Sequence, residues 1–212
     1  AKLYQQYKKL AQSSEAKNYS NAQKAWLNHA IKGFELSGVA LSDDKKQRFS
    51  EIKSRLAALS QTFSNNVLDA TDHYQLHLQE ASALAGVPDA LMTMFKEKAK
   101  AKGLEGFLVG LDMPSYQAIV TYCDNQALRK KLYFAYQCKA SDTSEYAMDD
   151  EHKFDNSEVL VETLQLRQEQ AELLGFENYA QVSLEKKMAD SVEQVTDFLL
   201  NLADNSKPFA EK

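Results

Sequence analysis

The sequence is poor in the residues on which several classes of protein depend. Its 212 residues include two cysteines, Cys123 and Cys138, which are too few for a disulfide framework or a four-cysteine zinc site. Seven glycines and three prolines are too few for a turn-rich β-sandwich or barrel. No apolar run approaches the roughly 18 residues that cross a bilayer, and residues 1–6 are too polar to begin a signal peptide. These absences predict a cytoplasmic protein with reduced thiols and no membrane partner.

The charge is mildly acidic and mixed in sign along most of the chain. Lysine and arginine number 25 against 30 acidic residues, which gives a net charge of −5. Nucleic-acid binding requires a concentrated basic face, so we expect no nucleic-acid partner. Hydrophobic residues make up 44% of the chain, which is enough for a substantial core and excludes a disordered chain.

Apolar residues recur at helical spacing along most of the chain, which predicts a mostly helical fold. A first helix is expected over residues 18–36, with Trp26 on its core side and Gly38 after its end. A second should begin behind the N-cap candidate Ser42 and continue for almost thirty residues. Its apolar stripe consists of Phe49, Ile52, Leu56, Leu59, Phe63 and Val67.

Later helices are marked mainly by their first residues. Pro88 can open a helix of about fourteen residues, and helices resume beyond Pro114, with Asn125 as an N-cap candidate. A further helix is predicted from Asn156 through Leu160, Leu164, Ala171 and Leu174, ending at Gly175. Residues 191–194 form a capping box that opens the last helix, and residues 141–156 form a polar, acid-rich loop.

In one short region, apolar residues recur at every second position instead of every third or fourth. Tyr74, Leu76 and Leu78 alternate with polar residues, which predicts a strand near residues 73–79. Residues 106–111 are a second extended candidate, and we expect the two strands to pair in antiparallel fashion. The predicted fold is therefore a mostly α, multi-helix region over residues 1–212 with a small two-stranded β-element.

The search for catalytic motifs finds none. Gly103, Gly106 and Gly110 have the wrong spacing for a dinucleotide-binding or P-loop motif, and no histidine is followed by glutamate as in His-Glu-x-x-His. His73 and His77 would share one face of a helix and could then hold zinc. On the predicted strand, however, they stand about 13 Å apart and face solvent.

Two other segments contain residue types that can act in catalysis or bind a metal ion. Asp149, Asp150, Glu151 and His152 lie on the polar loop and indicate a solvated acidic segment, since nothing apolar surrounds them. Cys123 lies in an apolar stretch without a nearby histidine and is expected to be buried. We therefore assign no catalytic, cofactor-binding or metal-ligating residue to this chain.

Seven blocks in one order closely resemble the thimet oligopeptidase and neurolysin family of zinc metallopeptidases, and the resemblance extends from Asn65 to the C-terminus. The blocks are Ala83-Leu-Ala-Gly-Val-Pro-Asp-Ala-Leu91, Gly103-Leu-Glu-Gly-Phe-Leu-Val-Gly-Leu-Asp-Met-Pro-Ser-Tyr116, Tyr122-Cys-Asp-Asn-Gln-Ala-Leu-Arg129, Ala135-Tyr-Gln-Cys-Lys-Ala-Ser-Asp142, Phe154-Asp-Asn-Ser157, Leu173-Leu-Gly-Phe-Glu-Asn-Tyr-Ala180 and Ser183-Leu-Glu-Lys-Lys-Met-Ala189. Cys138-Lys139 departs from the family, where Thr-Arg is expected before Ala-Ser-Asp.

The resemblance implies a nearly all-helical, two-lobed peptidase whose deep channel admits short peptides and excludes folded proteins. In the family, the C-terminal half holds zinc through His-Glu-x-x-His and a later glutamate. The chain would then be the N-terminal half, which contributes channel wall, while the catalytic half of the same polypeptide would follow beyond Lys212. This implies zinc in the full-length protein, none in this chain, and no activity for the chain alone.

A second interpretation remains open. The chain could be a stand-alone helical interaction protein that lacks the catalytic half. Whichever interpretation holds, a face that normally meets the catalytic half would be apolar and exposed in the isolated chain, which predicts self-association. A third interpretation, a small metal-binding protein using His73 and His77, has no third ligand nearby in the sequence.

Overall fold

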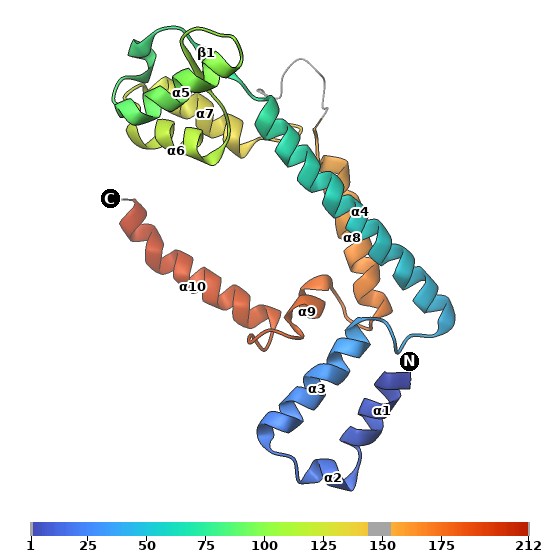
Figure 1. Cartoon of the computed structure of the whole chain (residues 1–212). Coiled ribbons are helices and arrows are strands. Elements are labelled where there is room, and N and C mark those ends of the chain that lie inside the picture. The colour runs from blue at the N-terminus through green and yellow to red at the C-terminus, as the bar shows by residue number, and fades with distance from the viewer. Residues whose placement is uncertain (1, 144–153, 212) are drawn as a thin grey trace. The chain divides into compact units, whose positions relative to one another are not determined.

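The computed structural model describes residues 2–143 and 154–211 and is mostly helical with one two-stranded sheet (Figure 1). The elements are α1 Lys2–Ala11, α2 Ser14–Lys17, α3 Asn21–Leu36, α4 Asp43–His73, β1 Leu76–Leu78, the 3₁₀ helix η1 Ala81–Leu84, α5 Asp89–Ala101, β2 Phe107–Val109, α6 Met113–Tyr122, α7 Gln126–Gln137, α8 Ser157–Leu173, α9 Tyr179–Leu184 and α10 Val192–Ala210. In these described ranges, no helix has both the length and the apolar character that a membrane span requires.

The chain divides into two compact units. Unit 1 comprises residues 1–57 and 163–212, and unit 2 comprises residues 58–162. The boundaries fall within α4 and α8, so each of these helices contributes residues to both units. The predicted polar loop 141–156 belongs to unit 2, and its residues 144–153, including Asp149–His152, lie outside the described residues.

Unit 1 begins with a helical hairpin in which α1 and α3 pack side by side and α2 lies in their connection. The Ser20 hydroxyl accepts a hydrogen bond from the backbone N–H of Gln23, and the Gln23 side chain accepts one from the backbone N–H of Ser20. This capping box satisfies N–H groups that the helix cannot pair internally, so α3 begins at Asn21. The Tyr4 hydroxyl donates to Glu35 at 3.0 Å and connects the two helices.

The long predicted helix is confirmed as α4. The Ser42 side chain hydrogen-bonds the Asp44 carboxylate and lowers its pKa, an arrangement that suits the positive end of the helix dipole. Phe49, Ile52 and Leu59 of the predicted stripe are buried. Within unit 1, the guanidinium of Arg48 donates two hydrogen bonds of 2.6 Å to Glu169, which joins α4 to the C-terminal part of α8.

The β-element of unit 2 confirms the antiparallel prediction, but its first strand is shorter than expected. β1 pairs with β2 in the register Leu76↔Val109, His77↔Leu108 and Leu78↔Phe107. The helix α4 continues to His73, and the backbone N–H of Tyr74 still bonds to Ala70 O at 3.3 Å. Placing His73 in the strand was therefore wrong, because helical hydrogen bonding extends through this position.

The core of unit 2 forms where α5, α6 and α7 pack with the two strands. Phe95 of α5 and Ile119 of α6 have no exposed surface. The other buried members are Tyr74, Leu84, Val87, Phe107, Val109, Leu111, Ala118, Cys123, Leu128, Leu132 and Ala135. Since these residues come from segments distant in sequence, the β-element and the helices stabilise one another through a shared apolar core.

A buried asparagine joins α4 to the start of α8 within unit 2. The side-chain amide of Asn156 donates to Phe63 O at 3.2 Å and accepts from Asn66 at 2.9 Å. Its backbone N–H donates to Ala140 O at 3.1 Å. These bonds satisfy polar groups that would otherwise be costly to bury.

Most predicted helix ends are confirmed. Pro88 precedes α5, and the Asn125 side chain accepts from the backbone N–H of Leu128 at the start of α7. Ser191 caps α10 through Gln194 N–H, but the Gln194 side chain accepts from the backbone of Asp190 instead of Ser191. Gly175 ends α8 with a φ of +85°, a conformation that favours glycine. The sequence did not predict the short elements α1, α2, η1 and α9.

Candidate functional site

The two histidines considered as metal ligands lie in different elements. His73 is in the last turn of α4, where its ring lies 5.6 Å from the ring of Phe154. His77 is on β1, and its Nε2 lies 2.6 Å from Glu105 O. Each imidazole thus has its own local contact, and neither contact involves the other histidine.

The cysteines are also in separate environments. Cys123 is buried, as predicted, and its thiol donates to Ala83 O at 3.5 Å. Cys138 follows α7 and is partly buried, and both thiols are free.

Lys139, at the departure from the family pattern, lies with its Nζ 3.9 Å from the centre of the Tyr136 ring, and burial lowers its pKa. This lysine therefore contacts an aromatic face next to the end of α7.

A zinc site needs three or more donor side chains that converge on one point. Within residues 2–143 and 154–211, no group of three histidine, cysteine, aspartate or glutamate side chains could hold a metal ion. The described residues therefore do not fit the zinc that the family resemblance implies, and we derive no reaction step through a metal in this chain.

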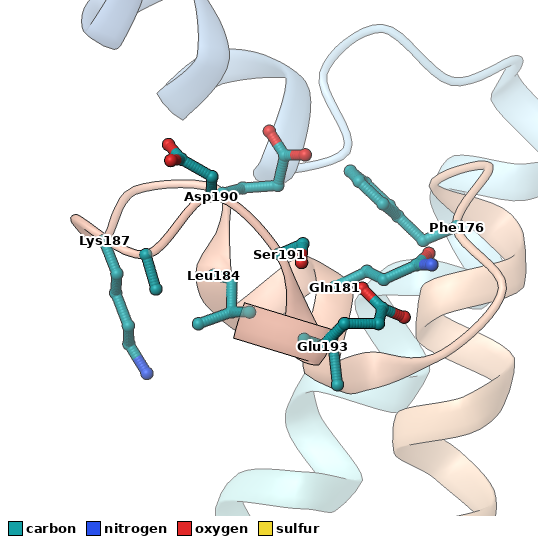
Figure 2. A pocket seen from close by; sticks show the side chains of 10 residues that line it. Phe176, Gln181, Leu184, Lys187, Asp190, Ser191 and Glu193 are labelled. Atoms are coloured by element: carbon teal, nitrogen blue, oxygen red, sulfur yellow. The ribbon is translucent and has the colours of Figure 1, made fainter. Parts of the chain in front are cut away.

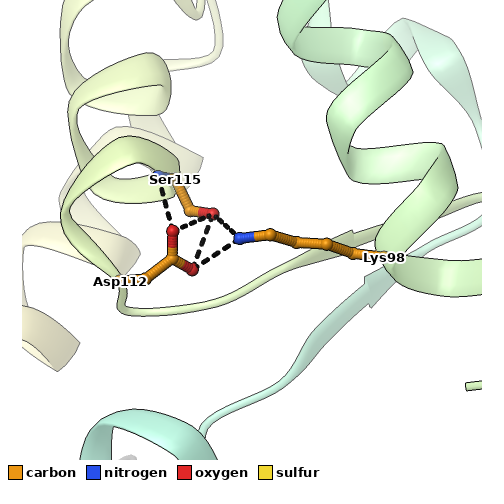
Figure 3. A network of polar contacts seen from close by, with 3 residues as sticks. All are labelled: Lys98, Asp112 and Ser115. Atoms are coloured by element: carbon orange, nitrogen blue, oxygen red, sulfur yellow. Dashed lines mark hydrogen bonds and ion pairs between the residues drawn. The ribbon is translucent and has the colours of Figure 1, made fainter. Parts of the chain in front are cut away.

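The most developed polar cluster joins α5 to the start of α6 in unit 2 (Figure 3). The ammonium of Lys98 donates to Asp112 Oδ2 at 2.6 Å and to Ser115 Oγ at 2.7 Å. The Ser115 hydroxyl donates to the Asp112 carboxylate at 2.9 Å, and the Ser115 backbone N–H donates to Asp112 Oδ1 at 3.2 Å. Asp112 is the N-cap of α6, so this carboxylate fixes the helix start and neutralises a lysine from another helix.

The three residue types of this cluster also occur in serine hydrolases, but their arrangement here favours a structural role. A nucleophilic serine needs an accessible hydroxyl and a base that can take its proton. Ser115 is fully buried, and its hydroxyl donates to Asp112, whose own ion-pair partner is Lys98. Local sequence patterns do not reveal the ion pair, because Lys98 is 14 residues from Asp112. The Asp-x-x-Ser spacing at the start of α6 was the available signal for the other two residues.

The pKa of Asp112 determines how the stability of the cluster depends on pH. Burial raises the pKa of its carboxyl, but hydrogen bonds from Lys98 and Ser115 lower it by more, so the net shift is downward. The folded pKa is therefore below the unfolded value of about 3.9. The resulting stabilisation is present above that value and is lost as the pH falls through the folded pKa.

We expect Asp112→Ala to lower the free energy of unfolding at pH 7 by about 2 kcal/mol, because it removes a helix cap and leaves Lys98 and Ser115 without their acceptor. Asp112→Asn should cost less, since asparagine also caps helices, and its difference from the wild type should shrink below about pH 4. Urea unfolding followed by circular dichroism at both pH values measures the free energy of unfolding of each variant.

Asp89→Ala, in the exposed first turn of α5, is the matched control and should cost no more than about 0.5 kcal/mol. Equal losses for the Asp112 and Asp89 variants would contradict the assigned role.

A hollow of about 450 Å³ lies where α9 leads into α10 in unit 1 (Figure 2). Gln181 accepts from Glu177 N–H at 3.0 Å, and Ser191 accepts from Gln194 N–H at 3.1 Å, so both side chains serve helix ends. Glu185 forms an ion pair with Lys32. The pKa of Glu193 is lowered by its own backbone N–H and by Ser191. Gln181, Ser191 and Glu193 thus serve local helix ends, and Glu185 pairs with a lysine of α3.

The apolar side of α10 is exposed to solvent. Phe198 is 66% exposed and Leu199 is 55% exposed, and Leu200, Leu202 and Phe209 are exposed as well. Contiguous apolar surface of this kind marks an interaction site in proteins. The exposed side of α10 is therefore a candidate interaction surface, whereas the Lys98–Asp112–Ser115 cluster has a structural role.

Comparison with known protein families finds two matches. Residues 119–212 match the sequence model of peptidase family M3. Residues 1–46 match the model of the neurolysin/thimet oligopeptidase N-terminal domain. The first of these matches begins inside α6 and includes α7–α10.

Comparison with curated proteins finds relatives that are much longer than this chain. Oligopeptidase A of Escherichia coli is 46% identical over 210 residues, which cover 99% of this chain and 30% of that protein. Probable cytosolic oligopeptidase A of Arabidopsis thaliana is 35% identical over 211 residues, covering 96% of this chain and 29% of that protein. Saccharolysin of Saccharomyces cerevisiae is 27% identical over 214 residues, covering all of this chain and 27% of that protein. The chain thus spans about 30% of the length of these relatives, whereas the family resemblance predicted an N-terminal half.

Proposed function

We propose that this chain, whose residues 119–212 match the model of peptidase family M3, forms part of the substrate-channel wall of a zinc metallo-oligopeptidase that hydrolyses short peptides. The observation that carries the proposal is the 46% identity to oligopeptidase A over 99% of the chain. Both units fall within this similarity, so the whole described fold is part of the resemblance. In this role residues 1–212 act as one helical region of the longer enzyme.

The catalytic role is assigned to a different part of the polypeptide. We propose that the zinc ligands and the general base lie in a C-terminal catalytic half outside this chain, which is the chain's partner in the enzyme. Location in the cytoplasm is part of the same proposal, and one Arabidopsis relative is named as probably cytosolic.

The purified 212-residue chain is therefore expected to hydrolyse no short peptide, with or without added zinc. Internally quenched peptides of about ten residues provide the assay, with turnover measured before and after treatment with a chelator. The positive control is the longer product of the same gene, which should hydrolyse these peptides and lose that activity on chelation. Chelator-sensitive turnover by the 212-residue chain alone would show that its own residues carry a metal site and would overturn the assignment.

A stand-alone helical interaction protein is the second candidate, and the exposed apolar side of α10 favours it. The reading frame downstream of the Lys212 codon distinguishes the two. A frame that continues to His-Glu-x-x-His and a later glutamate supports the peptidase. A stop codon close behind Lys212 supports the interaction protein.

A further inference from the structure

A hollow of about 680 Å³ lies where α6 and α7 meet in unit 2, and we call it the α6–α7 hollow. On a helix with 3.6 residues per turn, positions 126, 129, 130 and 133 fall on one side of α7. That side borders the hollow, and one valine of α6 borders it as well. The lining residues are Val120, Gln126, Ala127, Arg129, Lys130 and Tyr133.

Positive charge lines the α6–α7 hollow itself. Among the residues that the structure describes, its lining includes the cations Arg129 and Lys130 and no acid, and neither cation forms an ion pair. The sequences of α6 and α7 contain no aspartate or glutamate. Asp124, between the two helices, lies against Gly86 instead, where an added Cβ would be 2.8 Å from its Oδ1. The hollow is therefore locally cationic, although the whole chain has a net charge of −5.

The guanidinium of Arg129 is held in place by the backbone. Its Nη1 donates a hydrogen bond to the carbonyl oxygen of Cys123, a residue that is buried at the end of α6. A guanidinium has several further N–H donors and can bind a carboxylate through two of them at once. The bond to Cys123 therefore positions Arg129 before a ligand arrives and leaves donors available for that ligand.

The rest of the lining is mainly apolar. Val120, Ala127 and the ring of Tyr133 border the same space as the two cations. Tyr133 is 48% exposed, and its ring lies 5.8 Å from the ring of Phe134. The Lys130 ammonium lies 5.9 Å from that same Phe134 ring, so one aromatic neighbour contacts both lining side chains. A ligand that complements the hollow must carry negative charge with an apolar group beside it.

We propose that the α6–α7 hollow binds the C-terminal residue of a short peptide. The terminal carboxylate pairs with Arg129 and Lys130, and the last side chain, which is apolar, packs against Tyr133. These two groups of the ligand are attached to one carbon atom, so they present charge and apolar surface side by side. Inorganic phosphate carries charge without an apolar group, and an amidated peptide lacks the charge. The choice of a peptide rests on the proposed function, and the inference assigns one end of the substrate to this chain.

Nuclear magnetic resonance of the nitrogen-15-labelled 212-residue chain tests the proposal with two tetrapeptides. Both peptides are acetylated and consist of three alanines followed by a phenylalanine, and they differ only in a free or an amidated C-terminus. The free acid should shift the backbone amide signals of residues 126–133, with a dissociation constant of about 1 mM. The amide should bind at least about tenfold more weakly, because it lacks the carboxylate.

Lys130→Glu disables the α6–α7 hollow, and Lys131→Glu is its matched control. Both lysines are exposed on α7, but only Lys130 lines the hollow. The two substitutions change the net charge equally, so a general attraction between chain and peptide would respond equally to both. We expect Lys130→Glu to weaken binding of the free acid by about tenfold or more, and Lys131→Glu by less than about twofold. Both variants should retain the helical circular dichroism of the wild type.

Four results would overturn the proposal. No shift at residues 126–133 with up to about 10 mM free acid would show that the hollow does not take this ligand. Equal affinity for the free acid and the amide would show that the carboxylate is not bound. Equal losses for the two lysine variants would place the binding elsewhere, and sodium acetate that binds as tightly as the peptide would indicate a nonspecific anion effect. Binding is measured without hydrolysis, so a longer gene product that fails to cleave peptides would overturn the proposed function and leave this binding result standing.

Discussion

Phe95→Ala is expected to lower the free energy of unfolding by about 3–5 kcal/mol, because it removes a whole aromatic ring from a closed core. Phe95 lies on α5, is 0% exposed and belongs to the core that α5 shares with α6, α7 and β2. The loss combines the transfer free energy of the ring with the cost of the cavity that remains. Urea unfolding followed by far-ultraviolet circular dichroism measures the change.

Phe134→Ala is the matched control for this substitution. Phe134 lies on α7 in the same unit and is 44% exposed, with ring contacts to Tyr133 and to Lys130. Its truncation removes less buried surface and leaves no closed cavity, so we expect a loss below about 1.5 kcal/mol. Similar losses for Phe95→Ala and Phe134→Ala would contradict the position of the core.

Gly106→Ala is expected to destabilise unit 2 by about 2–4 kcal/mol, since it combines an unfavourable backbone conformation with a collision. Gly106 precedes β2 and has a φ of +84°. A Cβ at this position would lie 2.4 Å from Leu78 O and 3.0 Å from Gln79 Cα. Because these are backbone atoms beside β1, relief of the collision requires the two strands to separate.

Gly103→Ala isolates the conformational part of this effect. Gly103 also has a positive φ, +71°, but a Cβ there would have no atom within 4 Å. We expect a loss of about 1 kcal/mol from the backbone alone. Chemical denaturation of both variants under the same conditions gives the difference, and a cost for Gly103→Ala as large as that for Gly106→Ala would show that the collision contributes nothing.

The local signals in the sequence predicted where helices begin and end. Side-chain caps act over two or three residues, so Asn125 and Ser191 could be recognised without knowing the fold. The cap at Ser20 was missed, and the first helix was expected from residue 18 instead of Asn21. Gly175 could be recognised for the same reason. Alternating residues likewise located the first strand, although helical hydrogen bonding displaced its start beyond His73. The second strand was located by the short segment 106–111.

The sequence could not predict which apolar side of a helix is buried. Leu160 and Leu164 follow helical spacing on α8 as well as Phe49 and Ile52 do on α4, yet both leucines are exposed. Burial depends on whether another element packs there, which periodicity along one helix does not contain. The Lys98–Asp112–Ser115 cluster was missed for a related reason, because the chain must fold through β2 before Lys98 can reach Asp112.

Trp26 is the single tryptophan of the chain, and it lines a hollow of about 410 Å³ on the hairpin of unit 1 together with Leu10 and Leu27. The prediction that it lies on the core side of its helix is wrong, because its side chain is 62% exposed. Indole fluorescence excited selectively therefore originates from one surface position. The emission wavelength of an indole depends on how much water surrounds it, and this one is largely exposed. The intrinsic fluorescence of the unlabelled protein is thus a local optical reporter of whatever covers that surface.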